Sequence, residues 1–112
     1  MSMELIDDLK KLDEIKSIMV GLQEGRLTTL SRLLVEVEKA RAINENNLIL
    51  SDAAISLIGT LEQLATYIEE GVAFQCAMHD KIGLPPFHLV KEFTELVKSD
   101  RDFIARLGVR QA

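Results

Sequence analysis

The stretch SDAAISLIGTLEQLATYIEEGVAFQCAMHDKIGLPP, residues 51–86, decides the fold that we expect. Its apolar residues recur every three or four positions, which places them on one stripe of an α-helix. Ser51 or Asp52 can cap the start of this helix, because a short side-chain oxygen accepts a free backbone N–H there. Gly83 suits its end, and the proline pair that follows cannot continue it. We therefore predict a helix over 51–83, with a stripe formed by Ala54, Ile58, Leu61, Ala65, Ile68, Val72, His79 and Ile82.

The same spacing predicts three further helices, two before this stretch and one after it. The first covers 3–24 and the second 27–44, with Gly25 as the point where the first ends. The last covers 86–108, since proline is well placed in a first helical turn. Their stripes are Leu5, Leu9, Leu12, Ile15, Met19 and Leu22; Leu27, Leu30, Leu34, Val37 and Arg41; and Val90, Phe93, Val97, Ile104 and Leu107.

Short connections between amphipathic helices favour antiparallel neighbours. The chain of 112 residues is long enough for one domain with a core and too short for two ordinary ones. We therefore expect an all-α fold, a single four-helix, bundle-like domain of antiparallel helices over 1–112, which dimerisation could complete. Two alternatives stay open, a break of the third helix at Gly71 and a break of the fourth at Ser99.

Composition excludes several classes of function. The net charge of −5 argues against phosphate-backbone binding, and four Phe, one Tyr and no Trp offer little surface for base stacking. No apolar run approaches the roughly 20 residues of a membrane span, and the segment MSMELIDDLKKLDE does not have the pattern of a signal peptide. The lone Cys76 allows no disulfide within the chain. We expect a cytoplasmic protein that binds neither nucleic acid nor membrane.

Three ionisable residues fall on the apolar sides of their helices, namely Arg41, His79 and Asp100. A buried charge needs a partner, so these residues are candidates for a polar network, with Arg41 and Asp100 as its natural ion pair. In the alternative interpretation each side chain sits near a helix end and reaches water.

Cys76, His79 and Asp80 are weak candidates for metal ligands, because helical spacing places them near one another. The chain has no second Cys-x-x-Cys or Cys-x-x-His pair, which structural zinc sites nearly always show. We expect no metal, no cofactor and no catalytic residue.

Some apolar residues fall outside the stripes, and contiguous exposed apolar area usually marks an interface. Tyr67, Phe74 and Met78 are the candidates for such a surface, since aromatic residues and Met are enriched in interface cores. We therefore expect a homodimer, and a small acidic module that binds another protein as an adaptor, a regulator or an export chaperone. The alternative is a helical bundle that binds a small ligand, metal or substrate near His79, Arg41 and Asp100.

Overall fold

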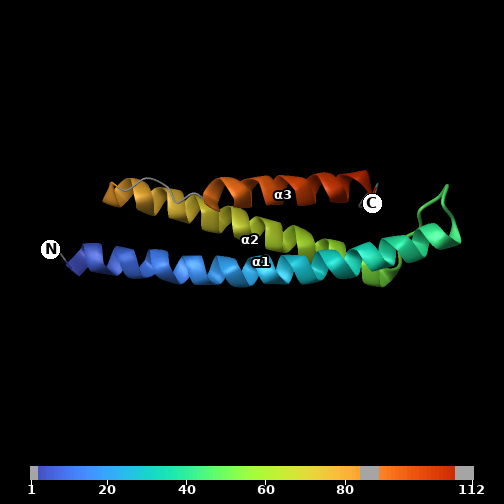
Figure 1. The fold of residues 1–112 in the computed structure, drawn as a ribbon, viewed down its shortest axis with the longest axis horizontal. Coiled ribbons are helices and arrows are strands. Elements are labelled where there is room, and N and C mark those ends of the chain that lie inside the picture. The colour runs from blue at the N-terminus through green and yellow to red at the C-terminus, as the bar shows by residue number, and fades with distance from the viewer. Residues whose placement is uncertain (1–2, 84–88, 108–112) are drawn as a thin grey trace.

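The computed structural model describes residues 3–83 and 89–107, and it is all-helical, as predicted, with no strand within those ranges. Three helices follow one another along the chain: α1 (Met3–Ile43), α2 (Asp52–Ile82) and α3 (Leu89–Arg106). Figure 1 shows α2 running antiparallel to both of the others and lying between them. The three helices form a narrow molecule with extents of 64 × 25 × 18 Å.

The structure has one helix, α1, where the sequence predicted two that meet at Gly25. The buried positions continue across that glycine in strict steps of seven residues. A Cβ atom on Gly25 would lie 3.8 Å from Leu64 Cδ2, so this part of α1 packs closely against α2. This packing offsets the cost of a glycine inside a helix, which is about 1 kcal/mol. The buried line of α1 comprises Leu12, Met19, Arg26, Leu33 and Ala40.

The ends of α2 lie at the residues that the sequence indicated. Ser51 caps the helix, because its Oγ accepts a hydrogen bond from the backbone N–H of Ala54 at 3.2 Å. Gly83 ends it with φ of 76°, a left-handed conformation that favours glycine. The helix does not break at Gly71, where a Cβ atom would lie 3.0 Å from Met19 Sδ.

Helix α3 is continuous from Leu89 to Arg106, so Ser99 does not interrupt it. The predicted start of this helix at Pro86 and its predicted end at Gly108 lie outside the described residues.

Two apolar clusters form the core, and each joins side chains of α1 and α2 to α3 or to Leu107, the residue directly after it. One holds Leu33, Val37, Ala54, Ile58, Leu61 and Leu107; the other holds Met19, Ala65, Ile68, Phe93 and Val97. Helix α2 packs against α1 and against α3, whereas the backbones of α1 and α3 do not approach each other closely. No stretch of helix within the described residues combines the length and apolar character that crossing a bilayer requires.

Candidate functional site

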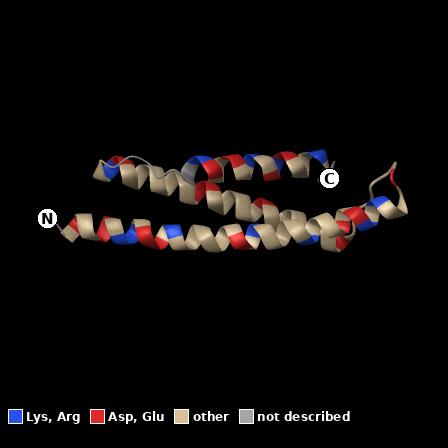
Figure 2. Ribbon diagram, in the orientation of Figure 1, with Lys and Arg blue, Asp and Glu red and all other residues tan. Residues whose placement is uncertain are grey.

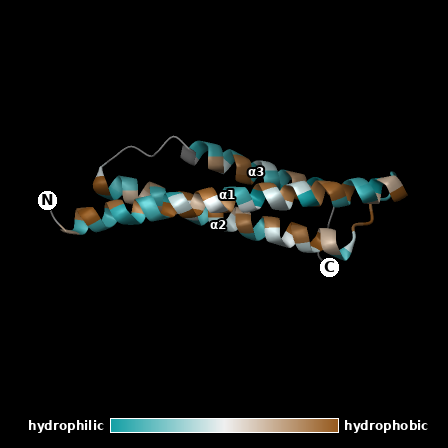
Figure 3. Cartoon of the chain, turned by 60° about the horizontal axis from the view of Figure 1, so that its bottom comes forward, coloured by the Kyte–Doolittle hydropathy of each residue, from teal (hydrophilic) through white to brown (hydrophobic). Residues whose placement is uncertain are grey.

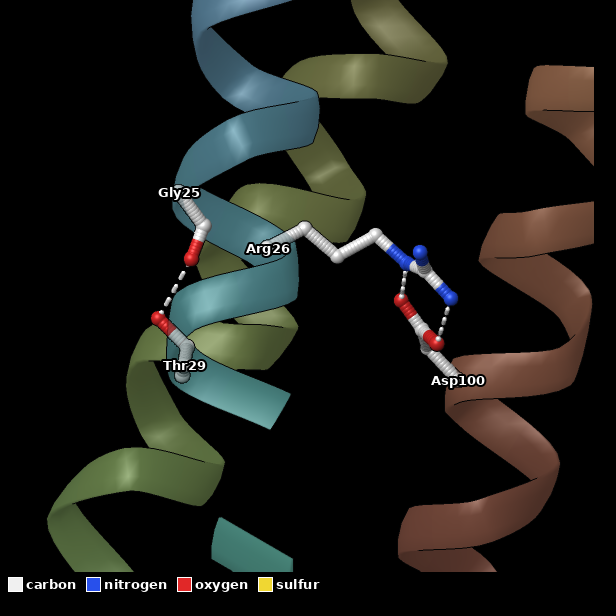
Figure 4. Close-up of polar contacts among 4 residues, drawn as sticks. All are labelled: Gly25, Arg26, Thr29 and Asp100. Atoms are coloured by element: carbon white, nitrogen blue, oxygen red, sulfur yellow. Dashed lines mark hydrogen bonds and ion pairs between the residues drawn. The ribbon is translucent and has the colours of Figure 1, made fainter. Parts of the chain in front are cut away.

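A buried ion pair joins α1 to α3 between the two apolar clusters. Arg26 Nη2 donates a hydrogen bond to Asp100 Oδ1 at 2.7 Å, and Arg26 Nε donates a second one to Asp100 Oδ2. Figure 4 shows the guanidinium reaching from α1 across to the carboxylate on α3. Arg26 is 5% exposed and Asp100 is 2% exposed. This bidentate geometry is what a buried charge pair requires, because each charge loses its water on folding.

The structure does not bring Arg41, His79 and Asp100 together. Asp100 is buried and paired, as the sequence suggested, but its partner is Arg26 instead of Arg41. Arg41 is exposed in the last turn of α1, at the end near the α1–α2 connection. His79 is buried in the last turn of α2, far along the bundle from Arg41. The predicted network of three residues does not form, and one ion pair takes its place. The sequence prediction identified the α3 member of this pair, Asp100, but not its α1 member, Arg26.

Two buried polar side chains of α2, Gln75 and His79, lack hydrogen-bond partners in the described structure. Gln75 is fully buried and His79 is 5% exposed. Both amide atoms of Gln75 and both ring nitrogens of His79 are unpaired. Each such group loses hydration on folding without a compensating bond, which destabilises the native state.

A second charged cluster ties the start of α1 to the end of α2. Lys81 Nζ lies 3.1 Å from Glu4 Oε1 and 3.1 Å from Asp8 Oδ2. Asp8 is buried, whereas half of the Lys81 side chain is exposed. The pKa of Lys81 is raised above its usual 10.5 because its ammonium donates hydrogen bonds to Glu4 and to Asp8. This cluster holds the open end of the α1–α2 hairpin together.

The weak metal candidates Cys76, His79 and Asp80 differ in their surroundings. Cys76 is half-buried, His79 is buried and Asp80 is exposed. Within the residues that the structure describes, no three His, Cys, Asp or Glu side chains converge in a way that could hold a metal ion.

An apolar groove of about 350 Å³ runs between α1 and α2. Tyr67 and Phe74, two of the predicted interface residues, line it, whereas the third, Met78, is buried. Ile18, which the sequence reasoning did not single out, faces them from α1. The lining consists of Ile15, Ile18, Leu22, Tyr67, Glu70, Gly71 and Phe74.

The groove is open to solvent although it is almost entirely apolar. Ile18 is 56% exposed, Tyr67 45% and Phe74 38%. Gly71 lies between the two aromatic residues along α2, and its lack of a side chain leaves room for Met19 in the core behind the groove. Glu70 is the single charged side chain among the lining residues.

A second hollow, of about 460 Å³, lies between α2 and α3 on another side of α2. An ion pair between Arg101 and Glu69 joins the two helices at its edge. Four charged side chains line this hollow, whereas the α1–α2 groove has one.

Figure 2 shows acidic and basic residues interspersed along α1 and α3, whereas the charged residues of α2 are acidic up to Lys81 in its last turn. Comparisons of the chain with protein-family models, with curated proteins and with solved structures found no match. Function is therefore inferred from the surfaces and contacts described above.

Proposed function

We propose that the protein is a small helical module that binds another protein, by taking an amphipathic helix of that partner into the α1–α2 groove. The observation that carries this proposal is the exposed apolar lining, with Ile18 on one wall and Tyr67 and Phe74 on the other. Large exposed apolar surface that loops do not cover is typical of interaction sites. Adaptor, regulator and export-chaperone roles in the cytoplasm all use binding of this kind.

The spacing of the lining residues supports a helix as the occupant. Tyr67 and Phe74 are seven residues apart on α2, which is two helical turns or about 10 Å. A partner helix with apolar residues at positions i, i+3 or i+4, and i+7 presents its anchors over the same length. Gly71 lies between these two aromatic residues on the wall that α2 forms.

Glu70 adds a requirement on the charge of the partner. It lies between Tyr67 and Phe74 along the chain and belongs to the groove lining. A Lys or Arg beside the apolar anchors of the partner helix would pair with this carboxylate. The complementary charge improves orientation and selectivity more than affinity.

The test is a phage-displayed library of helical peptides with apolar residues at these spacings, selected on the wild-type protein. Fluorescence anisotropy then measures the affinity of selected peptides for Ile18→Glu and Phe74→Glu. We expect each substitution to weaken binding at least tenfold, because it places a charge in the desolvated groove. Ile55→Glu is the matched control, since Ile55 is a similarly exposed apolar residue of α2 outside the groove, and it should bind normally. Equal binding to Phe74→Glu and to Ile55→Glu, or a library that yields no binder, would contradict the proposal.

A further inference from the structure

Helix α1 carries a second exposed apolar stripe, on a different flank from the groove. Val20 is 58% exposed, Leu27 50% and Leu34 44%. They follow one another at intervals of seven residues, so they form a line along the helix. At about 100° per residue, Val20 lies about 160° around the helix from Ile18 in the groove. Figure 3 shows hydrophobic segments recurring along α1.

No helix covers this stripe within the described residues. Helices α1 and α3 both pack against α2, but their backbones do not approach each other closely. Arg26 reaches across to α3, yet Leu27, the next residue, remains half exposed. The line supplies one of the two apolar positions per seven residues that form the seam of a coiled coil, and exposed apolar side chains in such a line are typical of a contact with another helix.

We propose that a second copy of this chain covers the stripe, with the two α1 helices antiparallel about a two-fold axis at Leu27. In this register Leu27 meets Leu27 of the partner subunit. Val20 meets Leu34 of the partner subunit, and symmetry repeats that contact on the other side of the axis. The apolar line is therefore complementary to itself, which a two-fold interface requires.

Charge at the two ends of the line selects the antiparallel arrangement. Asp13 lies seven residues before Val20 and Arg41 lies seven residues after Leu34, and both are exposed. Pairing centred on Leu27 places Asp13 opposite Arg41 of the partner subunit, and this contact also occurs twice. A parallel pairing in register would place Asp13 opposite Asp13 of the partner subunit, where like charges repel. The exposed Arg41, in the last turn of α1, is an end contact of the dimer.

The first experiment measures mass by size-exclusion chromatography with light scattering over a range of protein concentrations. The wild type should be a dimer. Leu27→Glu should raise the dimer dissociation constant at least a hundredfold, because it places two carboxylates at the axis. Ile18→Glu is the matched control, since it introduces the same charge into the groove, and it should remain dimeric. Circular dichroism checks that both variants stay helical.

Two results of this experiment would overturn the dimer: a wild type that is monomeric throughout, or a dimer that Ile18→Glu disrupts and Leu27→Glu does not. The groove test above uses Phe74 and peptide affinity, so the two proposals can fail separately.

The second experiment tests the register by disulfide trapping, in a background where the native Cys76 is replaced by Ser. A mixture of Val20→Cys and Leu34→Cys should form a cross-linked heterodimer under mild oxidation, whereas Val20→Cys alone should not cross-link. Cross-linking of Val20→Cys with itself would show a parallel pair and overturn the proposed register. Asp13→Arg should weaken the dimer about tenfold, and adding Arg41→Asp should restore it. If the dimer of the double variant is as weak as the dimer of Asp13→Arg alone, Asp13 and Arg41 of the partner subunit do not form this contact.

Discussion

Arg26 on α1 and Asp100 on α3 form a bidentate ion pair that is sealed between the two apolar clusters of the core. This polar contact links α1 directly to α3, whose backbones stay apart. Sliding α3 by one turn would leave both charges buried without a partner. The pair therefore fixes the position of α3 along the bundle more than it adds to stability.

Replacing Arg26 by Ala should lower the free energy of unfolding by about 3–5 kcal/mol, because Asp100 would remain as an uncompensated buried charge. Urea unfolding followed by circular dichroism measures the change. The double variant Arg26→Met, Asp100→Leu should recover most of the loss, since it removes both charges. Arg101→Ala is the control, because Arg101 and Glu69 form an exposed pair that contributes about 0–1 kcal/mol. Equal losses of unfolding free energy for Arg26→Ala and Arg101→Ala would show that breaking the buried pair destabilises the protein no more than breaking the exposed one.

Replacing His79 by Leu should raise the free energy of unfolding by about 1–3 kcal/mol. Both ring nitrogens of His79 are buried and find no hydrogen-bond partner among the described residues, and an apolar side chain of similar size removes that penalty. Thermal and urea unfolding at neutral pH measure the gain. A marked loss of stability would mean that the imidazole makes an interaction outside the described residues.

Lys81 should make stability depend on pH in the alkaline range. Its pKa is raised in the native state, so the stabilisation from Glu4 and Asp8 is fully present below the unfolded value of 10.5. It is lost as pH rises through the higher native pKa, where the ammonium deprotonates. We therefore expect the stability difference between the wild type and Lys81→Met to be constant from neutral pH up to 10.5 and to shrink above it. Urea titrations of both proteins across this range, at low salt, test this; a difference that does not change with pH would contradict it.

Gly71 and Gly59, two glycines of α2, should respond in opposite ways to alanine. Gly59 has open space around it, so Gly59→Ala should stabilise the protein by about 1 kcal/mol through helix propensity. At Gly71 the added methyl group would lie 3.0 Å from Met19 Sδ and 3.2 Å from Met19 Cγ, inside the core. We expect Gly71→Ala to be less stable than Gly59→Ala by about 1–3 kcal/mol, because of this overpacking. Thermal unfolding of the two variants side by side measures the difference, and equal stabilities would show that Met19 moves aside without cost.

The sequence predicted the helical class and the ends of α2 because those features are local. Ser51 and Gly83 satisfy backbone groups within a few residues of themselves, so their roles can be recognised without knowledge of the rest of the fold. The exposure of Tyr67 and Phe74 was also predictable, since they depart from an otherwise regular stripe.

The error in α1 came from treating Gly25 as the end of a helix. A restart at Leu27 makes Leu27, Leu34 and Arg41 the buried line, whereas the structure buries the residue before each of them. One residue rotates a helical face by about 100°, so these three positions were predicted on the wrong side of α1, whereas Val37 of the same predicted stripe is buried. The same choice also exchanged Arg26 for Arg41 as the partner of Asp100. The seven-residue interval between Leu12 and Met19, continued once more, reaches Arg26 and could have identified it. The prediction instead followed the apolar residues Leu27 and Leu34.

The peripheral place of α3 has a consequence for how the native state opens. The backbone of α3 packs against α2 alone, whereas α2 also packs against α1. The amide protons of α3 should therefore exchange with solvent through a partial opening in which α3 leaves and the α1–α2 hairpin remains closed. Such an opening also exposes Arg26 and Asp100 to water, which removes the penalty of separating them. Native-state hydrogen exchange should accordingly divide the molecule into two cooperative units, with α3 as the less protected one.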